Sequence, residues 1–164
     1  MPRKPLPLQG IEELLAYDPN SGAITWVKSP AKAVAGCLDK RNGYWRIKAN
    51  GKLYAAHRIA WYLHTGEDPG SKDIDHINGN RNDNRACNLR LATRSENMRN
   101  TKKRQGGTSN HKGVSWESGR SKWRADIRIN GKSRQIGRFD TELEAYAAYC
   151  EAAIAHHGEF ANFG

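Results

Sequence analysis

The sequence has 164 residues, 37% of them hydrophobic, and its 27 Lys and Arg against 17 Asp and Glu give a net charge of +10. No apolar run approaches the roughly 18 residues of a membrane helix, and the start of the chain lacks the apolar stretch of a signal peptide. We therefore expect a cytoplasmic protein with no membrane partner. Three widely spaced cysteines, Cys37, Cys87 and Cys150, argue against a disulfide framework and against a cysteine-ligated zinc. The excess positive charge indicates a polyanionic partner, of which nucleic acid is the commonest.

The first elements in chain order are short. Residues 10–17 (GIEELLAY) predict an amphipathic helix, and residues 23–27 (AITWV) predict a strand. Asn50-Gly51 then separates two strand-like runs, which is the strongest short-range signal for a β-hairpin with a type I′ turn. The first of these strands alternates a basic face, with Arg46 and Lys48, and an apolar face. Residues 57–65 predict a helix that Gly66 ends.

Residues 72–100 (KDIDHINGNRNDNRACNLRLATRSENMRN) carry the pattern that bears on function. A short strand ends at Asp75 and His76, an Asn-rich loop follows, and residues 88–93 form a second strand. Thr93 is a good helix N-cap with Glu96 three residues later, the arrangement of a capping box. This strand-loop-strand-helix unit is compact enough for Asp75 to face Asn97 across a gap sized for one divalent ion.

The same residues resemble the HNH endonucleases with the ββα-metal fold, in their phage and intron-homing branch. The similarity lies in DHINGN, DNR, NL, AT and EN, in this order between Asp75 and Asn97. The resemblance implies that Asp75 and Asn97 hold one Mg²⁺ or Mn²⁺ per active site through oxygen ligands. It implies that His76 takes the proton from the attacking water and that Asn88 fixes the imidazole's tautomer and tilt. It also implies action in a phage-infected or bacterial host cell.

Two further residues near this pattern have alternative roles. His57, which precedes a predicted helix, is either a supporting site residue or a packed structural histidine. Asn100 is better suited to a contact on the helix surface or with phosphate than to metal ligation.

The chain downstream of the pattern has a different character. Residues 101–110 (TKKRQGGTSN) are polar, basic and Gly-rich, as in a linker. Three strands follow, with a second Asn-Gly turn at Asn130, and then an Ala-rich helix with Thr141 as N-cap and Gly158 at its end. Residues 112–138 hold eight basic and two acidic residues, while residues 139–164 hold five acidic residues and no Lys or Arg. This indicates a cationic sheet face with an acidic helix behind it.

The downstream module resembles an APETALA-type (ethylene-response-factor) DNA-binding domain. The similarity lies in KGVSW, KWRADIR, IGRFDTELEAYAAYCEAA and GEFANF. In that family the three-stranded sheet lies in the major groove of DNA. The residues that we expect to contact DNA, here and upstream, are Arg46, Lys48, Lys102, Lys103, Arg104, Lys112, Ser115, Arg124, Arg128, Ser133 and Gln135.

The predicted fold class is α+β. A ββα-metal nuclease module, preceded by a β-hairpin and a helix, occupies residues 1–104, residues 105–111 are the linker, and residues 112–164 are a three-stranded antiparallel sheet packed on one α-helix. The leading hypothesis is a metal-dependent endonuclease of double-stranded DNA, acting as a monomer or a DNA-induced dimer. One alternative is a DNA-binding transcriptional regulator with a degenerate nuclease module, and another is an RNA-binding or RNA-cleaving protein.

Overall fold

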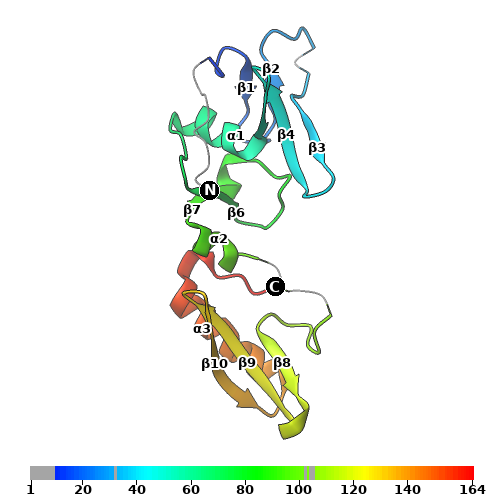
Figure 1. The fold of residues 1–164 in the computed structure, drawn as a ribbon, viewed down its shortest axis with the longest axis vertical. Coiled ribbons are helices and arrows are strands. Elements are labelled where there is room, and N and C mark those ends of the chain that lie inside the picture. Colours follow the sequence, from blue (N-terminus) through cyan, green and yellow to red (C-terminus); the bar gives the residue numbers. More distant parts are fainter. Residues whose placement is uncertain (1–9, 32, 102, 104–105) are drawn as a thin grey trace. The chain divides into compact units, whose positions relative to one another are not determined.

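The computed structural model describes residues 10–31, 33–101, 103 and 106–164. The fold is α+β, as predicted, and the chain forms two compact units, Met1–Thr93 and Arg94–Gly164 (Figure 1). The division falls upstream of the linker that we expect over residues 105–111. The last helix of the strand-loop-strand-helix pattern therefore groups with the second unit.

In the residues that the structure describes, the first unit contains three small antiparallel sheets and one α-helix. One sheet pairs β1 with β2, another has the order β3-β4-β5, and the third pairs the two strands of the candidate site, described below. The elements are β1 (Leu15–Tyr17), β2 (Ile24–Trp26), β3 (Cys37–Asp39), β4 (Tyr44–Ala49), β5 (Lys52–Ala55) and α1 (Ala56–Thr65).

The helix predicted over residues 10–17 is wrong. A single turn, closed by the hydrogen bond from Leu15 N to Ile11 O (2.9 Å), is followed at once by β1. One turn is enough to bring Ile11 and Leu15 onto the same side, and both are buried. Leu15 to Tyr17 then pair with β2, and a backbone committed to that ladder cannot continue a helix.

The predicted hairpin at Asn50-Gly51 is confirmed. Both turn residues have positive φ, 47° and 73°, as a type I′ turn requires. The strand before it has the expected alternation, since Ile47 and Ala49 are buried and Lys48 is exposed. Helix α1 ends as predicted, with Gly66 in the left-handed conformation.

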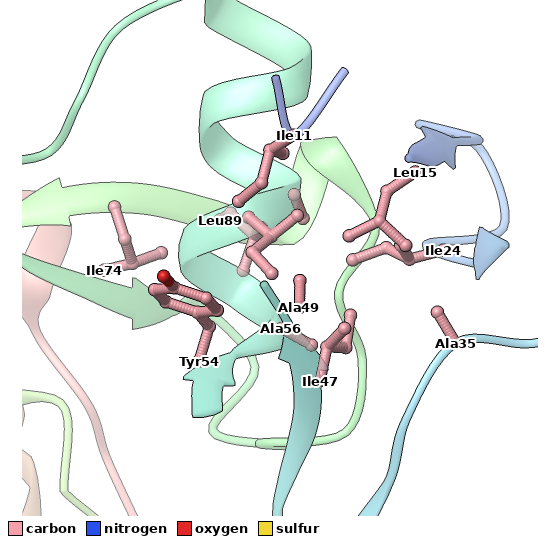
Figure 2. Close-up of a cluster of buried hydrophobic side chains, with 12 residues drawn as sticks. Ile11, Leu15, Ile24, Ala35, Ile47, Ala49, Tyr54, Ala56, Ile74 and Leu89 are labelled. Atoms are coloured by element: carbon pink, nitrogen blue, oxygen red, sulfur yellow. The ribbon is translucent and has the colours of Figure 1, made fainter. Parts of the chain in front are cut away.

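One hydrophobic core joins these elements to the strands that carry the candidate site. Figure 2 shows Ile11 from the turn before β1, with Leu15 and Ile24 of the first sheet, beside the buried side chains of β4 and β5. Ile74 and Leu89, from the next two strands, belong to the same cluster. Burial of apolar side chains on this scale is the main force that holds the site strands in place.

The site strands are β6 (Asp73–His76) and β7 (Leu89–Ala92), which pair antiparallel. The loop between them ends in a short 3-10 turn, Ala86–Asn88. Helix α2 (Arg94–Arg99) follows β7 directly and opens the second unit. The predicted order of strand, loop, strand and helix is confirmed.

The second unit has a three-stranded antiparallel sheet of order β10-β9-β8 and one long helix. The elements are β8 (Val114–Glu117), β9 (Lys122–Ile129), β10 (Lys132–Phe139) and α3 (Glu142–His157), with 3-10 turns at Ser118–Arg120 and Gly158–Phe160. Helix α3 covers one face of the sheet, where Ala125 and Ile127 of β9 meet Ala145 and Tyr149.

The local signals of this unit are confirmed. Asn130 and Gly131 have φ of 50° and 79° at the turn between β9 and β10. Thr141 and Glu144 form the predicted capping box, with the Thr141 hydroxyl accepting from Glu144 N at 3.2 Å.

In the part of the chain that the structure describes, no helix has the length and apolar character needed to span a membrane.

Candidate active site

His76, the predicted general base, is the last residue of β6 and is only 4% exposed. Its Nε2 lies 3.2 Å from Oδ1 of Asn84. A side-chain amide oxygen can only accept a hydrogen bond, so Nε2 carries the proton in the neutral ring. Nδ1 is then the ring nitrogen with a lone pair, which is the atom able to accept a proton from water.

Burial lowers the pKa of His76 below the ordinary histidine value. The hydrogen bond with Asn84 and the negative charges of Asp75 and Asp83 oppose this shift, while the positive charge of Arg81 adds to it. The direction favours a neutral imidazole at pH 7. A neutral ring is the form that a general base needs before the reaction.

The rings of His57 and Tyr44 lie beside this base. The ring centroids of His57 and His76 are 5.2 Å apart with their planes nearly perpendicular, and Tyr44 lies 5.0 Å from His57 and 6.0 Å from His76. The guanidinium of Arg81 sits 5.0 Å above the Tyr44 ring, a cation–π contact. His57 therefore belongs to the surroundings of His76, whereas the sequence left its role open.

Asn84 is a site residue that the sequence reasoning missed. Its backbone carbonyl accepts a hydrogen bond from the Tyr17 hydroxyl at 2.8 Å. Burial raises the pKa of Tyr17 to about 12, so the hydroxyl keeps its proton. Gly22 packs so closely against this segment that a Cβ there would lie 2.6 Å from Arg85 N. The end of β1 and the turn that follows it thus fix the backbone of Asn84, whose side chain contacts His76.

Asn88, which we expect to orient His76, makes hydrogen bonds to the loop between β6 and β7 through both ends of its side-chain amide. Its Oδ1 accepts from Asn78 N at 2.9 Å, and its Nδ2 donates to Asp83 O at 2.7 Å. Asp83 also receives hydrogen bonds from Arg85 (2.8 and 2.6 Å), the largest cause of the lowering of its pKa to about 2. Through these contacts Asn88 fixes the loop that carries Asn84. The side-chain oxygen of Asn84 in turn accepts a hydrogen bond from the imidazole of His76.

Asp75, the first predicted metal ligand, is buried beside a second residue that the sequence reasoning did not single out. Arg90 donates to Asp75 Oδ2 through Nε at 2.9 Å, and its second nitrogen lies 2.8 Å from the same oxygen. The two residues are directly opposite in the β6–β7 ladder. Arg90 thus fixes the orientation of the Asp75 carboxylate.

The second predicted ligand belongs to the other compact unit. Asn97 is on α2, which belongs to the second compact unit, so its pairing with Asp75 stays a prediction. Asn100, just after α2, is buried, and its backbone and side-chain oxygens both accept from Asn162. Within residues 10–31, 33–101, 103 and 106–164, no three His, Cys, Asp or Glu side chains gather as a metal cluster. A site of one carboxylate and one amide does not require such a cluster.

Five of the residues expected to contact DNA share one sheet face: Ser115, Arg124, Arg128, Ser133 and Gln135. Arg128 is opposite Ser133, and Arg124 is opposite Ser115, in the two strand pairings. Alternation along β9 puts this face away from Ala125, which packs on α3. Arg128, Ser133 and Gln135 are exposed.

Several of these basic residues also have internal partners. Arg124 Nε contacts Asp126 at 2.7 Å, and Arg46 Nε lies 3.9 Å from an Asp39 oxygen. The ammonium groups of Lys103 and Lys112 donate to backbone carbonyls of the second unit. Lys48 is exposed. The expected contacts of Lys102 and Arg104 lie outside the described residues.

A buried histidine at a strand end, an Asn-rich loop, a second strand and a short helix together define an HNH-type nuclease module. Residues 54–99 match the HNH endonuclease family. The chain is 36% identical to Protein 3.8 of Escherichia phage T7 over 107 residues, which cover 65% of this chain and 88% of that protein. It is 32% identical to an HNH endonuclease of Acanthamoeba polyphaga mimivirus over 121 residues, 74% of this chain and 62% of that protein.

The chain therefore contains an HNH endonuclease domain and belongs to the same family as the phage T7 protein. No solved structure matched significantly.

Proposed function

We propose that the protein is a metal-dependent DNA endonuclease of the phage or homing type, which hydrolyses phosphodiester bonds at or near a site bound by its second unit. The observation that carries this proposal is the state of His76. It is buried, it lies at the end of β6, and Asn84 accepts from its Nε2. HNH relatives of viral origin support the same reaction class. We infer that the protein acts in an infected bacterial cell.

The general base in this proposal is Nδ1 of His76. It accepts a proton from the water that attacks the scissile phosphorus, and Asn84 holds the ring while the proton moves. The imidazolium formed in this step gains from the negative charges of Asp75 and Asp83, which raise the pKa of His76 against the effect of burial. General base assistance contributes typically 10²- to 10⁴-fold to the rate.

Asp75 and Asn97 are the proposed ligands of one Mg²⁺ or Mn²⁺. Carboxylate and amide oxygens suit these hard cations, which keep several waters as further ligands. The buried Asp75 carboxylate fits this role, since Arg90 holds one oxygen and fixes the orientation of the other. When bound, the ion stabilises charge on the phosphate and on the departing oxygen.

The second unit is the proposed reader of double-stranded DNA, as an APETALA-type domain. Arg128, Ser133 and Gln135 are exposed on one face of the antiparallel strands. A ribbon of antiparallel strands fits the major groove, where Arg can bind guanine edges. The basic residues Lys48, Lys102, Lys103 and Arg104 would add contacts with phosphate. One catalytic unit in each chain makes a monomer a nicking enzyme, and a double-strand break then needs a DNA-induced dimer or two successive cuts.

The test is cleavage of supercoiled plasmid and phage DNA with Mg²⁺, with Mn²⁺ and with EDTA. His76→Ala should reduce the rate by 10²- to 10⁴-fold, whereas His156→Ala, on the exposed side of α3, should cut like the wild type. The topoisomers separate nicking from double-strand cleavage. If no metal supports cutting while salt-sensitive binding to duplex DNA persists, the protein is a DNA-binding regulator with a degenerate nuclease module. Preference for RNA over duplex DNA would also refute the proposal.

A further inference from the structure

Helix α2 is too short to be stable by its own backbone hydrogen bonds. It has 6 residues, whereas isolated helices of fewer than about 12–15 residues are marginal in water. Its geometry must therefore be set by contacts with the rest of the protein. Those contacts matter because α2 carries Asn97, the proposed second metal ligand.

The first contact is made by Lys112, which lies just before β8. Its Nζ donates to Arg99 O at 2.9 Å and to Thr101 O at 2.7 Å. Carbonyls at a helix C-terminus have no partner within the helix, and a cation there also meets the negative end of the helix dipole. Burial lowers the pKa of Lys112 to about 8, so the ammonium is still charged at pH 7.

The second contact is made by Asn162, in the closing segment of the chain. Its Nδ2 donates to Asn100 O at 3.1 Å and to Asn100 Oδ1 at 2.8 Å. Asn162 is anchored in turn, because its carbonyl accepts from the Tyr149 hydroxyl and its own Oδ1 accepts from Gly164 N. Tyr149 belongs to the core between α3 and the sheet. A continuous set of contacts thus joins that core to the end of α2.

We propose that Lys112 and Asn162 are positioning residues that hold the end of α2 within the second unit, and with it the proposed metal ligand Asn97. This inference rests on the proposed function. It also gives Lys112 a role other than the DNA contact expected from the sequence. The reading unit would then contribute to catalysis as well as to affinity for the target.

The decisive variants are at Asn162. The alanine variant leaves the net charge of the protein unchanged, and the aspartate variant keeps the size of the side chain. Asn162→Ala removes both hydrogen bonds to Asn100, and Asn162→Asp keeps the shape and the bond from Gly164 N while losing the Nδ2 donor. The matched control is Asn110→Ala, at an exposed position of the same unit. Each full-length variant is titrated with Mn²⁺ in the plasmid assay, its affinity for duplex DNA is measured in EDTA, and hydrogen exchange is followed over residues 94–100.

We expect both Asn162 variants to raise the Mn²⁺ concentration for half-maximal cutting by about 10- to 100-fold, the usual effect of losing a residue that orients a metal ligand. Exchange in α2 should become faster, and DNA affinity should stay within about twofold of the control. Wild-type metal dependence in both variants would overturn the inference, even if exchange in α2 became faster. So would a loss of DNA affinity equal to the loss of cutting.

Lys112 supplies an independent pair. Lys112→Met removes the donor and keeps an apolar stem, while Lys112→Arg keeps a charged donor and should restore most of the metal affinity. The charge-matched control is Lys132→Met, exposed on β10. Equal failure of Lys112→Met and Lys112→Arg would refute a role through donation to the helix carbonyls. If the wild type cuts with no metal, the proposed function fails, and this inference with it. Normal cutting with unchanged variants refutes this inference alone.

Discussion

Asn84→Ala gives the sharpest test of the site around His76. The substitution removes the hydrogen bond of 3.2 Å at Nε2 and leaves the imidazole, the proposed base, in place. A buried neutral hydrogen bond contributes about 0.5–1.5 kcal/mol net, and leaving a buried donor unsatisfied costs about 1–3 kcal/mol. Since each 1.4 kcal/mol is a factor of ten, we expect kcat to fall by about 10- to 100-fold. The fall should be smaller than that of His76→Ala.

The pH dependence of cutting tests the same contact through charge. Because burial lowers the pKa of His76, the acidic limb of kcat/KM for the wild type should lie below the ordinary histidine value of about 6.5. Asn84→Asp places a carboxylate beside Nε2, which stabilises the imidazolium and raises the pKa. The acidic limb should therefore move to higher pH in this variant.

The assay is initial-rate nicking of plasmid DNA between pH 5 and pH 9 at saturating Mg²⁺. Asn82→Ala, exposed in the same loop, is the control and should behave as the wild type. Circular dichroism confirms that each variant is folded. If Asn84→Ala cuts as fast as Asn82→Ala, or if Asn84→Asp leaves the acidic limb unmoved, the assignment of Asn84 is wrong.

Three substitutions elsewhere test the supports of the two units, each by urea unfolding. Gly22→Ala should destabilise the protein by at least about 2 kcal/mol. A side chain at φ of 75° is strained, and the Cβ of the alanine would lie 2.6 Å from Arg85 N. A free energy of unfolding equal to that of the wild type would contradict the close packing. Arg90→Gln leaves the buried Asp75 carboxylate without this ion pair and should cost about 3–5 kcal/mol, and adding Asp75→Asn should recover part of the loss. Thr141→Ala removes the cap of α3 and should cost about 1 kcal/mol, without changing the metal dependence of cutting.

The sequence predicted the features whose causes are local. Asn50-Gly51 and Asn130-Gly131 specify their turns through residues that tolerate positive φ, and both hairpins are present. The capping box of α3 depends on Thr141 and a residue three positions later. The Asn- and Gly-rich run that follows His76 likewise marks the end of the strand that carries Asp75 and His76.

The features that the sequence did not predict depend on contacts between distant residues. The backbone of Asn84 is held by Tyr17, 67 positions away, so no window of neighbouring residues could reveal this support. The end of α2 is held from Asn162, 62 positions away. Turn composition at residues 105–111 predicted a linker, but such composition describes the local backbone and says nothing of which elements pack together.

The division of the chain after Thr93 has a consequence for exchanging target specificity between relatives. A chimera joined at residue 105 would take α2 from one parent and its supports, Lys112 and Asn162, from the other. A chimera joined between Thr93 and Arg94 would transfer the helix with its supports as one inherited piece. The segment to transfer is therefore longer than the sheet that we propose reads DNA, and it includes the helix that ends the HNH motif.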